Sequence, residues 1–251
     1  MKLKSSHLTL VVSIGLISIS GSAIAIESAE EIYKKGVKIF VHKSIGAIID
    51  STIHYENGDQ EKRAFFLAKK EQNSDKSSIL IRFLEPDDIK CTAVLVNKIG
   101  DKDKRYAYFP ALKRVRIIPE SDKGKEVFGI GISYEDLGAP QGQFEEPKEI
   151  DREGVIHYQL TLVDSSKTSQ YLIDSTSYQL KEMNVLKNGD LEKKVVINEI
   201  KPYFGDDLIT SWNINYPKTN RSIQYSIRPD SITEKLKDSL FHKNKLKRCK
   251  F

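Results

Sequence analysis

The adjacent carboxylates Glu135 and Asp136 are the residues whose types best suit general acid–base chemistry. That chemistry requires both carboxyl groups to converge on one substrate atom, whereas neighbouring strand residues point to opposite faces. No histidine, serine or cysteine lies at a spacing that would make it their partner. We expect the two carboxylates to pair with nearby arginines, and the sequence predicts no catalytic residue and no enzyme.

Metal and cofactor chemistry has as little support. His42, His54, His157 and His242 are scattered singly, without the short spacings typical of metal ligands. The chain has no phosphate-binding glycine loop and no Gly-x-Ser-x-Gly elbow. The sequence therefore predicts neither a metal nor a cofactor.

Cys91 and Cys249 are the only cysteines. A disulfide closing so long a loop could stabilise the fold by about 4–5 kcal/mol in the chain-entropy model. However, Cys91 begins an apolar, strand-like run, whereas Cys249 lies in a polar terminus. The sequence favours two isolated thiols and leaves a bridge open.

The block Ser78–Leu137 is rich in aromatic, aliphatic and arginine side chains, which indicates a binding surface or cavity wall. Tyr106 and Tyr108 share one strand face, and Arg114 and Arg116 share another. The arginines could bind a carboxylate or phosphate headgroup at a cavity rim, although ordinary strand alternation would leave them facing solvent. The candidate wall residues are Phe83, Val94, Tyr106, Tyr108, Leu112 and Tyr134, with Arg114 and Arg116 at the rim.

Residues 1–25 have the pattern of an export signal. Lys2 and Lys4 precede an apolar run, and Ala23-Ile24-Ala25 resembles a cleavage site. The alternative is an uncleaved membrane anchor, but the run is shorter than the ~20 residues of a spanning helix. We expect cleavage after Ala25 and one mature domain, residues 26–251, outside the cytoplasm.

The formal net charge is +5, and much of the excess lies near the end of the chain. Nucleic-acid binding would need basic residues concentrated on one face, so this charge does not predict it. A solvated tail is the expected role, and contact with anionic lipid or an acidic partner is the alternative. The tail residues are Lys243, Lys245, Lys247, Arg248 and Lys250.

Hydrophobic periodicity predicts a mainly β domain, in which short strands form an antiparallel sheet curled into a barrel or part-barrel. Asn57-Gly58 and Asn188-Gly189 are typical of hairpin turns. A helix is expected over Glu27–His42, and a second after Ser231, where Glu234 would complete a capping box. The expected strands are Ile48–Tyr55, Lys62–Lys69, Ile79–Leu84, Thr92–Asn97, Arg105–Phe109, Lys113–Ile118, Val155–Val163, Gln170–Ile173, Leu180–Leu186, Lys194–Glu199, Ile209–Asn215 and Ser222–Ile227.

Three segments, Phe83–Pro86, Tyr108–Arg116 and Tyr134–Leu137, together resemble the LolA-like family of outer-membrane lipoprotein-sorting proteins. The resemblance implies a curved, incomplete antiparallel β-barrel with covering helices. It also implies a hydrophobic cavity for acyl chains of lipoproteins or envelope lipids, and a periplasmic location. Cys91 departs from the family pattern, which commonly has glycine there.

The leading hypothesis is therefore a periplasmic, non-enzymatic carrier of lipoprotein acyl chains or lipid, in transient contact with membranes. The alternative is an accessory module that docks to a resistance-nodulation-division-type membrane transporter of the inner membrane, as the resemblance implies for this subfamily. A hydrolase with an unrecognised site ranks lowest, because no nucleophile has a base. No nucleic-acid partner is expected.

Overall fold

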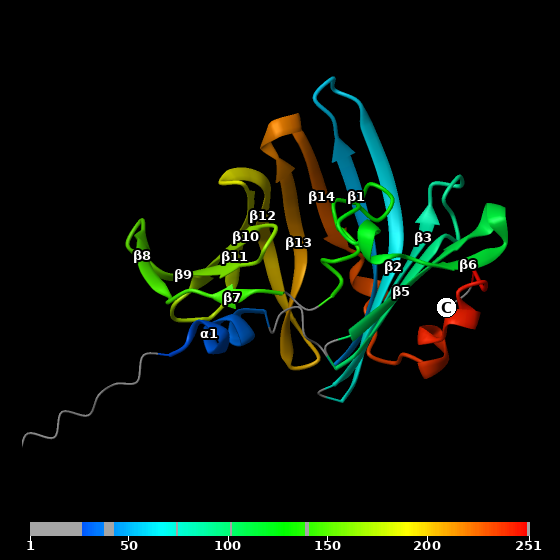
Figure 1. Cartoon of the computed structure of the whole chain (residues 1–251), viewed down its shortest axis with the longest axis horizontal. Helices are drawn as coiled ribbons and strands as arrows, with labels where there is room; N and C mark the ends of the chain where they lie inside the picture. The colour runs from blue at the N-terminus through cyan, green and yellow to red at the C-terminus, as the bar shows by residue number, and fades with distance from the viewer. Residues whose placement is uncertain (1–26, 38–42, 74, 101, 139–140, 250–251) are drawn as a thin grey trace, which may run out of the picture.

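The computed structural model describes residues 27–37, 43–73, 75–100, 102–138 and 141–249, and the export signal expected at residues 1–25 lies outside them. Across the described residues, the strands form one 14-stranded antiparallel sheet in the order β6-β5-β4-β3-β2-β1-β14-β13-β12-β11-β10-β9-β7, with β8 also paired to β9 (Figure 1). Within the same residues, no helix is long and apolar enough to cross a membrane.

The sheet has two halves. The first half contains β1 (Ser44–His54), β2 (Gln60–Asn73), β3 (Lys76–Glu85), β4 (Ala93–Ile99), β5 (Lys102–Phe109) and β6 (Arg114–Ile117). The second contains β7 (Gln143–Phe144), β8 (Lys148–Arg152), β9 (Val155–Val163), β10 (Thr168–Asp174), β11 (Leu180–Lys187), β12 (Asp190–Tyr203), β13 (Asp206–Tyr216) and β14 (Arg221–Ile227).

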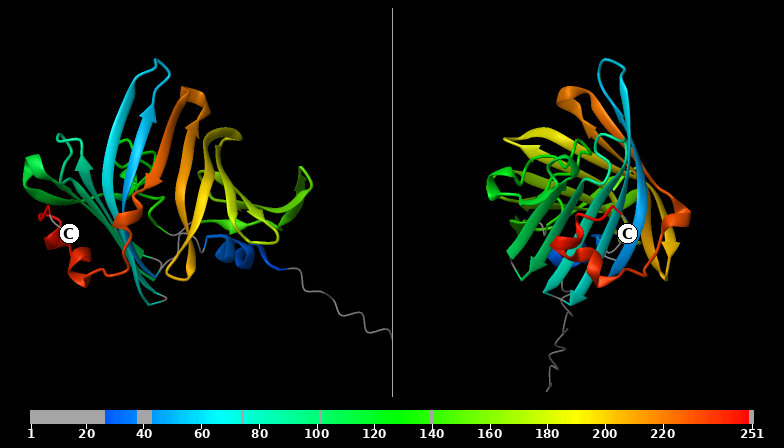
Figure 2. Two further views of the ribbon diagram at one scale, coloured as in Figure 1. Left: turned by 180° about the vertical axis from the view of Figure 1, so that it is seen from behind. Right: turned by 90° about the vertical axis from the view of Figure 1, so that its right-hand side faces the viewer.

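Tight turns connect neighbouring strands within each half. The predicted Asn188-Gly189 turn joins β11 to β12, and both residues have positive φ (53° and 86°), as the favoured hairpin turn requires. The halves meet where β1 pairs with β14, which sets Ile49 opposite Ile227 and Ile53 opposite Ile223. The terminal strands β6 and β7 do not pair, so the strongly curved sheet stays open (Figure 2). The predicted incomplete barrel is confirmed.

Both faces of the first half are apolar. Phe65 pairs with Phe83 on one face, and Leu80 pairs with Leu95 on the other. All four side chains are buried, which explains why these strands read as almost continuous apolar runs. We call the face that carries Phe65 the inner face and the opposite one the outer face.

The inner face of the second half is covered by α1 (Ala29–Gly36). A capping box starts this helix: the Ser28 hydroxyl accepts from the Glu31 amide, and the Glu31 carboxylate accepts from the Ser28 amide. Ile32 packs against Leu160 and its neighbours. The helix is shorter than the predicted Glu27–His42, whose last residues, 38–42, lie outside the described chain.

The helix predicted after Ser231 is wrong, because the backbone there is engaged by the sheet. Thr233 pairs with Gly46 through two backbone hydrogen bonds of 2.7 and 2.9 Å, and the Ser231 hydroxyl accepts from the Ile48 amide. Residues 229–249, which we call the outer cover, instead form the short 3-10 turns η5 (Pro229–Ser231), η6 (Asp238–Phe241) and η7 (Lys243–Lys245). They pack on the outer face through Leu236, Phe241 and Leu246.

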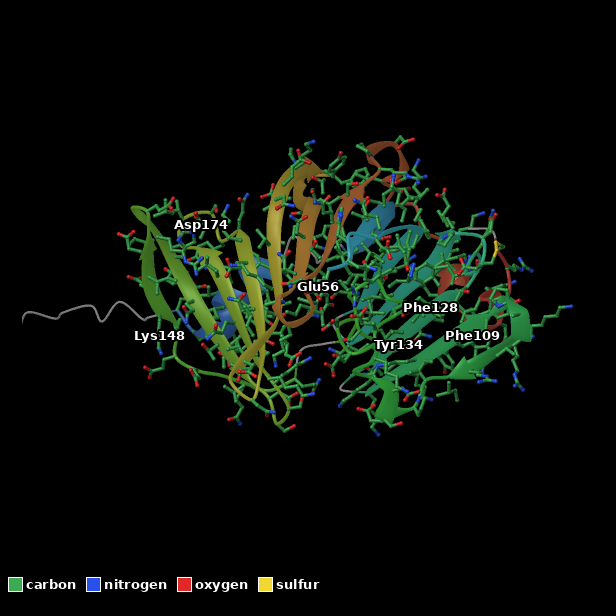
Figure 3. All side chains as sticks on the ribbon, turned by 90° about the horizontal axis from the view of Figure 1, so that it is seen from above. Glu56, Phe109, Phe128, Tyr134, Lys148 and Asp174 are labelled. Atoms are coloured by element: carbon green, nitrogen blue, oxygen red, sulfur yellow. A yellow bond between two sulfur atoms is a disulfide. The ribbon has the colours of Figure 1, made fainter. Side chains whose placement is uncertain are left out.

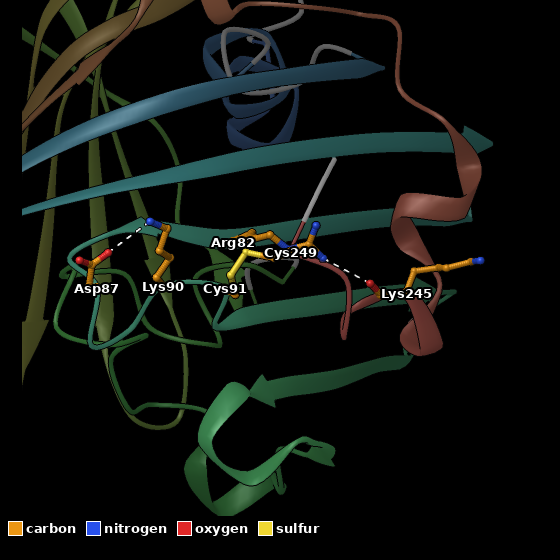
Figure 4. The surroundings of a disulfide bond; sticks show 6 residues. All are labelled: Arg82, Asp87, Lys90, Cys91, Lys245 and Cys249. Atoms are coloured by element: carbon orange, nitrogen blue, oxygen red, sulfur yellow. Dashed lines mark hydrogen bonds and ion pairs between the residues drawn. A yellow bond between two sulfur atoms is a disulfide. The ribbon is translucent and has the colours of Figure 1, made fainter.

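A disulfide between Cys91 and Cys249 fastens the end of the outer cover to the turn between β3 and β4 (Figure 4). This overturns the expectation of two isolated thiols, and the terminal basic segment is not a free tail. Cys91 has a φ of 66°, a left-handed conformation that explains why the family pattern favours glycine there.

Candidate functional site

The inner face of the first half is covered by residues 118–138, which we call the inner cover. This segment follows β6 at one edge of the sheet and leads towards β7 at the other, so it crosses the concave side. Its 3-10 turn η3 (Glu120–Asp122) begins after Pro119, and a small loop closes where the Val127 amide donates to the Ile132 carbonyl at 2.8 Å. It thus covers the sheet without a regular helix or a long strand.

The underside of the inner cover is apolar. Val127 and Ile130 are fully buried, and Tyr134 and Leu137 are nearly so. Phe128 lies with its ring centroid 5.3 Å from that of Phe83 in an edge-on arrangement. The space under the cover is therefore filled by packed side chains.

Close contact with the sheet requires glycine at position 131. It has a φ of 65°, and a Cβ there would lie 2.8 Å from Ile223 Cδ1 and 3.0 Å from the Tyr216 hydroxyl. The Tyr216 hydroxyl donates to the Gly131 carbonyl at 2.9 Å, and the Tyr225 hydroxyl donates to the Ile130 carbonyl. Burial raises the pKa of both tyrosines, so both remain neutral donors.

One ionic contact, between Glu126 and Arg221, holds the inner cover to β14. The guanidinium reaches both carboxylate oxygens, at 3.0 and 2.7 Å, and donates to the Gly129 carbonyl at 3.0 Å. From β2, Arg63 Nε donates to the Phe128 carbonyl at 3.0 Å. Burial raises the pKa of Glu126, but the hydrogen bonds and charge of Arg221 outweigh it and hold that pKa below its ordinary value.

Two further ion pairs join the inner cover to the second half of the sheet, which also contains β14. Glu135 pairs with Lys167, and Asp136 pairs with Lys193 of β12 at 2.7 Å. Burial raises the pKa of Asp136, but Lys193 outweighs it and holds the pKa below its ordinary value. The predicted ion pairs therefore exist, with lysines instead of arginines, and the two carboxylates bind different partners.

Between the inner cover and α1, a strip of apolar side chains is only half-buried. Met183, Ile197 and Trp212 pack against the cores beneath both elements. Trp212 stacks on Tyr225 with ring centroids 4.8 Å apart and planes 9° apart. This half-buried strip lies where the two cores meet, and we call it the inner gap.

The structure divides the predicted wall between the two faces. Phe83 and Val94 are buried on the inner face, whereas Tyr106 and Tyr108 lie on the outer face against the outer cover. Tyr134 belongs to the inner cover, beside Phe109 and Phe128 and far from Lys148 and Asp174 (Figure 3).

The remaining predicted residues lie at the edge of the sheet. Leu112, in the 3-10 turn η2 (Pro110–Leu112), is 45% exposed. Arg114 and Arg116 are exposed on β6 and point to the inner-face side, opposite Phe109 and Ala107. The eight residues do not form one wall. The sequence reasoning did not identify the inner gap, Glu126 or Arg221. The strand alternation that places Trp212 and Ile214 on one face is the signal that could have located the inner gap.

The second half carries an open groove of about 710 Å³, lined in part by His157, Leu172, Asp174 and Glu182. Glu182 is bound by Lys194 at 2.9 Å and by Arg152 at 3.4 Å. Within the described residues, no group of three or more His, Cys, Asp or Glu could hold a metal ion. A groove whose charges pair with each other offers little to an acyl chain.

This architecture is shared with known proteins. Residues 75–248 match the model of a family whose description reads "Uncharacterized protein", and the chain therefore belongs to that family. No curated protein matches the chain.

The solved structures that share the fold include three described as follows. A putative outer membrane lipoprotein-sorting protein domain from Vibrio parahaemolyticus aligns over 88% of this chain and 98% of its own, with a TM-score of 0.78 and 21% identity. A DUF1329 family protein from Desulfovibrio piger covers 88% and 100% (TM-score 0.76, 17% identity). A LolA superfamily protein from Nitrosomonas europaea covers 87% and 99% (TM-score 0.70, 14% identity). The resemblance inferred from the motifs is confirmed: the fold is LolA-like.

Proposed function

We propose that the protein is a periplasmic, non-enzymatic carrier that binds acyl chains of lipoproteins or envelope lipids on the inner face of its sheet. The observation that carries this proposal is a continuous apolar face closed by a segment of turns that a few polar contacts hold. Support comes from the LolA-like fold. It also comes from the structural relative from Vibrio parahaemolyticus, which is described as a putative outer membrane lipoprotein-sorting protein domain. The transporter-docking alternative gains no support from these comparisons.

Binding would require the inner cover to move, because its side chains fill the space beneath it. Burying its four main apolar side chains stabilises the closed form by about 1.5–3 kcal/mol each, or about 6–12 kcal/mol together. An acyl chain of about 16 carbons gains about 13 kcal/mol when its methylenes leave water. For an acyl chain taken up from water, the two quantities are similar, so such a chain can replace the cover without a large net cost.

The inner gap is the expected point of entry. Met183, Ile197 and Trp212 already offer half-exposed apolar surface beside the cover. An acyl chain that binds there first can extend under the cover as Glu126 and Asp136 release their partners. Because Trp212 is the only tryptophan, its fluorescence reports directly on this step.

The test combines native mass spectrometry of the mature, exported protein with titration of a fluorescent fatty-acid probe. We expect a copurifying lipid or acylated peptide, and probe binding that changes Trp212 emission. Arg221→Met should accelerate probe uptake, because it removes the bond between Glu126 and β14. A protein free of lipid that takes up no probe, in the wild type and in Arg221→Met, would contradict the proposal.

Arg228→Met is a matched control for this test. Arg228 follows β14 and also binds a carboxylate, that of Asp50, at 2.8 and 2.6 Å. It lies where the two halves of the sheet meet and makes no contact with the inner cover. Its loss should leave the rate of probe uptake unchanged.

A further inference from the structure

Positive charge without carboxylate partners is concentrated on the outer cover. Its last part, residues 235–249, contains six lysines and arginines and one aspartate, a formal charge of +5, and the whole outer cover, which also contains Asp230 and Glu234, carries +3. The aspartate, Asp238, is bound by Lys70 at 2.6 Å. Within the described residues, the exposed side chains of Lys243, Lys247 and Arg248 have no carboxylate within 4.0 Å.

The contacts of the outer cover hold the backbone that carries these charges in place. Its chain runs along β4 and β3: Asn97 Nδ2 of β4 donates to the Phe241 carbonyl at 3.5 Å, and Arg82 Nη2 of β3 donates to the Lys245 carbonyl at 3.4 Å. The disulfide then fixes Cys249, directly after Arg248 (Figure 4). Because Leu246 is fully buried between these points, the neighbouring lysines project away from the sheet.

The sheet itself adds to this surface. Lys104 lies opposite Asn97, and Lys102 lies opposite Ile99, so both lysines share the outer face with the outer cover. Both are exposed and have no carboxylate partner within the described part of the chain. The charged surface therefore extends from the outer cover onto β5.

Two isolated aliphatic side chains are exposed on the same face of the sheet as these cations. Ile117 is 73% exposed and pairs with Tyr106, which belongs to the outer-face core, and Ile99 is 57% exposed. They are the two most exposed large hydrophobic side chains of the described residues. Exposed aliphatic groups flanked by lysines are typical of surfaces that rest in the headgroup region of a membrane.

We propose that this surface docks the protein on an anionic lipid bilayer. The basic outer face comprises Lys102, Lys104, Lys243, Lys247 and Arg248, together with the exposed Ile99 opposite Lys102 and Ile117 on β6. This inference rests on the proposed carrier function, since such a carrier exchanges its cargo with membranes. A bilayer fits better than an acidic protein because flexible lysines and scattered isoleucines need no shape-complementary partner.

The test is co-sedimentation of the mature protein with phosphatidylcholine vesicles, with and without phosphatidylglycerol, at low and high salt. We expect binding only to the anionic vesicles, and weakening by salt, because surface charge attraction is screened. Lys102→Glu with Lys104→Glu should weaken this binding by about 25-fold or more, since each surface cation contributes roughly a factor of five and the substitutions also reverse the charge. Ile117→Ser should weaken it less.

The matched control is Lys148→Glu with Lys187→Glu, the same charge change on exposed lysines of the second half. It should leave vesicle binding almost unchanged. Probe uptake measured without vesicles separates the two proposals, because the Lys102 and Lys104 variants should keep it even if docking is lost.

Three results would overturn the membrane assignment. These are equal binding to neutral and anionic vesicles, equal loss in the control variant, and retention on polyglutamate without vesicle binding. The last would identify an acidic protein as the partner. If the wild-type protein took up no probe but still bound anionic vesicles, the carrier function would be overturned and the docking surface would remain supported.

Discussion

The inner and outer covers both lie across the first half of the sheet and both lack regular helices, yet different interactions hold them. The outer cover is fixed by a disulfide, a backbone bridge to Gly46 and the buried side chain of Leu246. The inner cover relies on apolar packing and on ion pairs such as Glu126–Arg221, with no covalent tie. The comparison indicates that the inner cover is the one that can open while the protein stays folded.

The largest expected effect comes from removing the disulfide with Cys91→Ser and Cys249→Ser. The bridge closes a loop of 158 residues, so the free energy of unfolding should fall by up to about 5 kcal/mol. Urea unfolding with and without reductant measures this, and the variant should be insensitive to reductant. If the variant also took up probe as fast as Arg221→Met, the distinction between the covers would fail.

Matched cavities under each cover sharpen the comparison. Ile130→Ala and Leu246→Ala each truncate a fully buried aliphatic side chain, and each should lower the free energy of unfolding by about 2–4 kcal/mol. Only Ile130→Ala should increase the rate and affinity of fatty-acid probe binding, because only it frees space on the inner face. Equal probe binding by the two variants would contradict the assignment of the binding face.

Acid should loosen the inner cover before the outer one. The folded-state pKa values of Glu126 and Asp136 lie below their ordinary values of 4.5 and 3.8, so ionisation stabilises the closed form. That contribution is complete above pH 4.5 and is lost as the pH falls through the lower folded values. Probe uptake should therefore accelerate in acid, and Glu126→Gln should reduce this dependence. If the rate of probe uptake did not depend on pH, the ion pairs of Glu126 and Asp136 would play no part in opening the inner cover.

The smallest effect is expected for Lys193→Met, which removes the partner of Asp136. Both side chains are partly exposed, so the loss should be about 1 kcal/mol, with a modest increase in uptake rate. Lys201→Met, which breaks the more exposed pair with Glu199, is the control and should change neither quantity. If Lys201→Met accelerated probe uptake as much as Lys193→Met does, the acceleration would reflect a general effect of charge and not the contact with Asp136.

The sequence predicted the strands other than β7 and β8, because each of those predicted is a local pattern between turn residues, whereas Gln143–Phe144 and Lys148–Arg152 lie in a segment that reads as a loop. The sequence could not assign the predicted wall, because β3 and β4 are apolar on both faces and periodicity cannot tell which cover each face meets. The resulting error separated Tyr106 from Phe83. The sequence reasoning also missed the inner cover, because Val127 and Ile130 follow no helical or strand period.

The prediction of a C-terminal helix failed for a different reason. Ile232, Leu236 and Leu240 have helical spacing, but the backbone of Thr233 pairs with Gly46, far away in the sequence. Such a long-range bond overrides local propensity. The disulfide was missed similarly, because only the outer cover brings Cys249 to Cys91.

The pairing of β1 with β14 also constrains how the chain reaches this structure. Every other ladder of the described sheet joins strands that lie near each other in the sequence, so each half can form as a series of hairpins. The β1–β14 ladder joins Ile49 to Ile227, across almost the whole described chain. Because closing a loop over that span is unfavourable, we expect this ladder to form late in folding. Until it forms, both apolar faces of the first half are open to other hydrophobic chains.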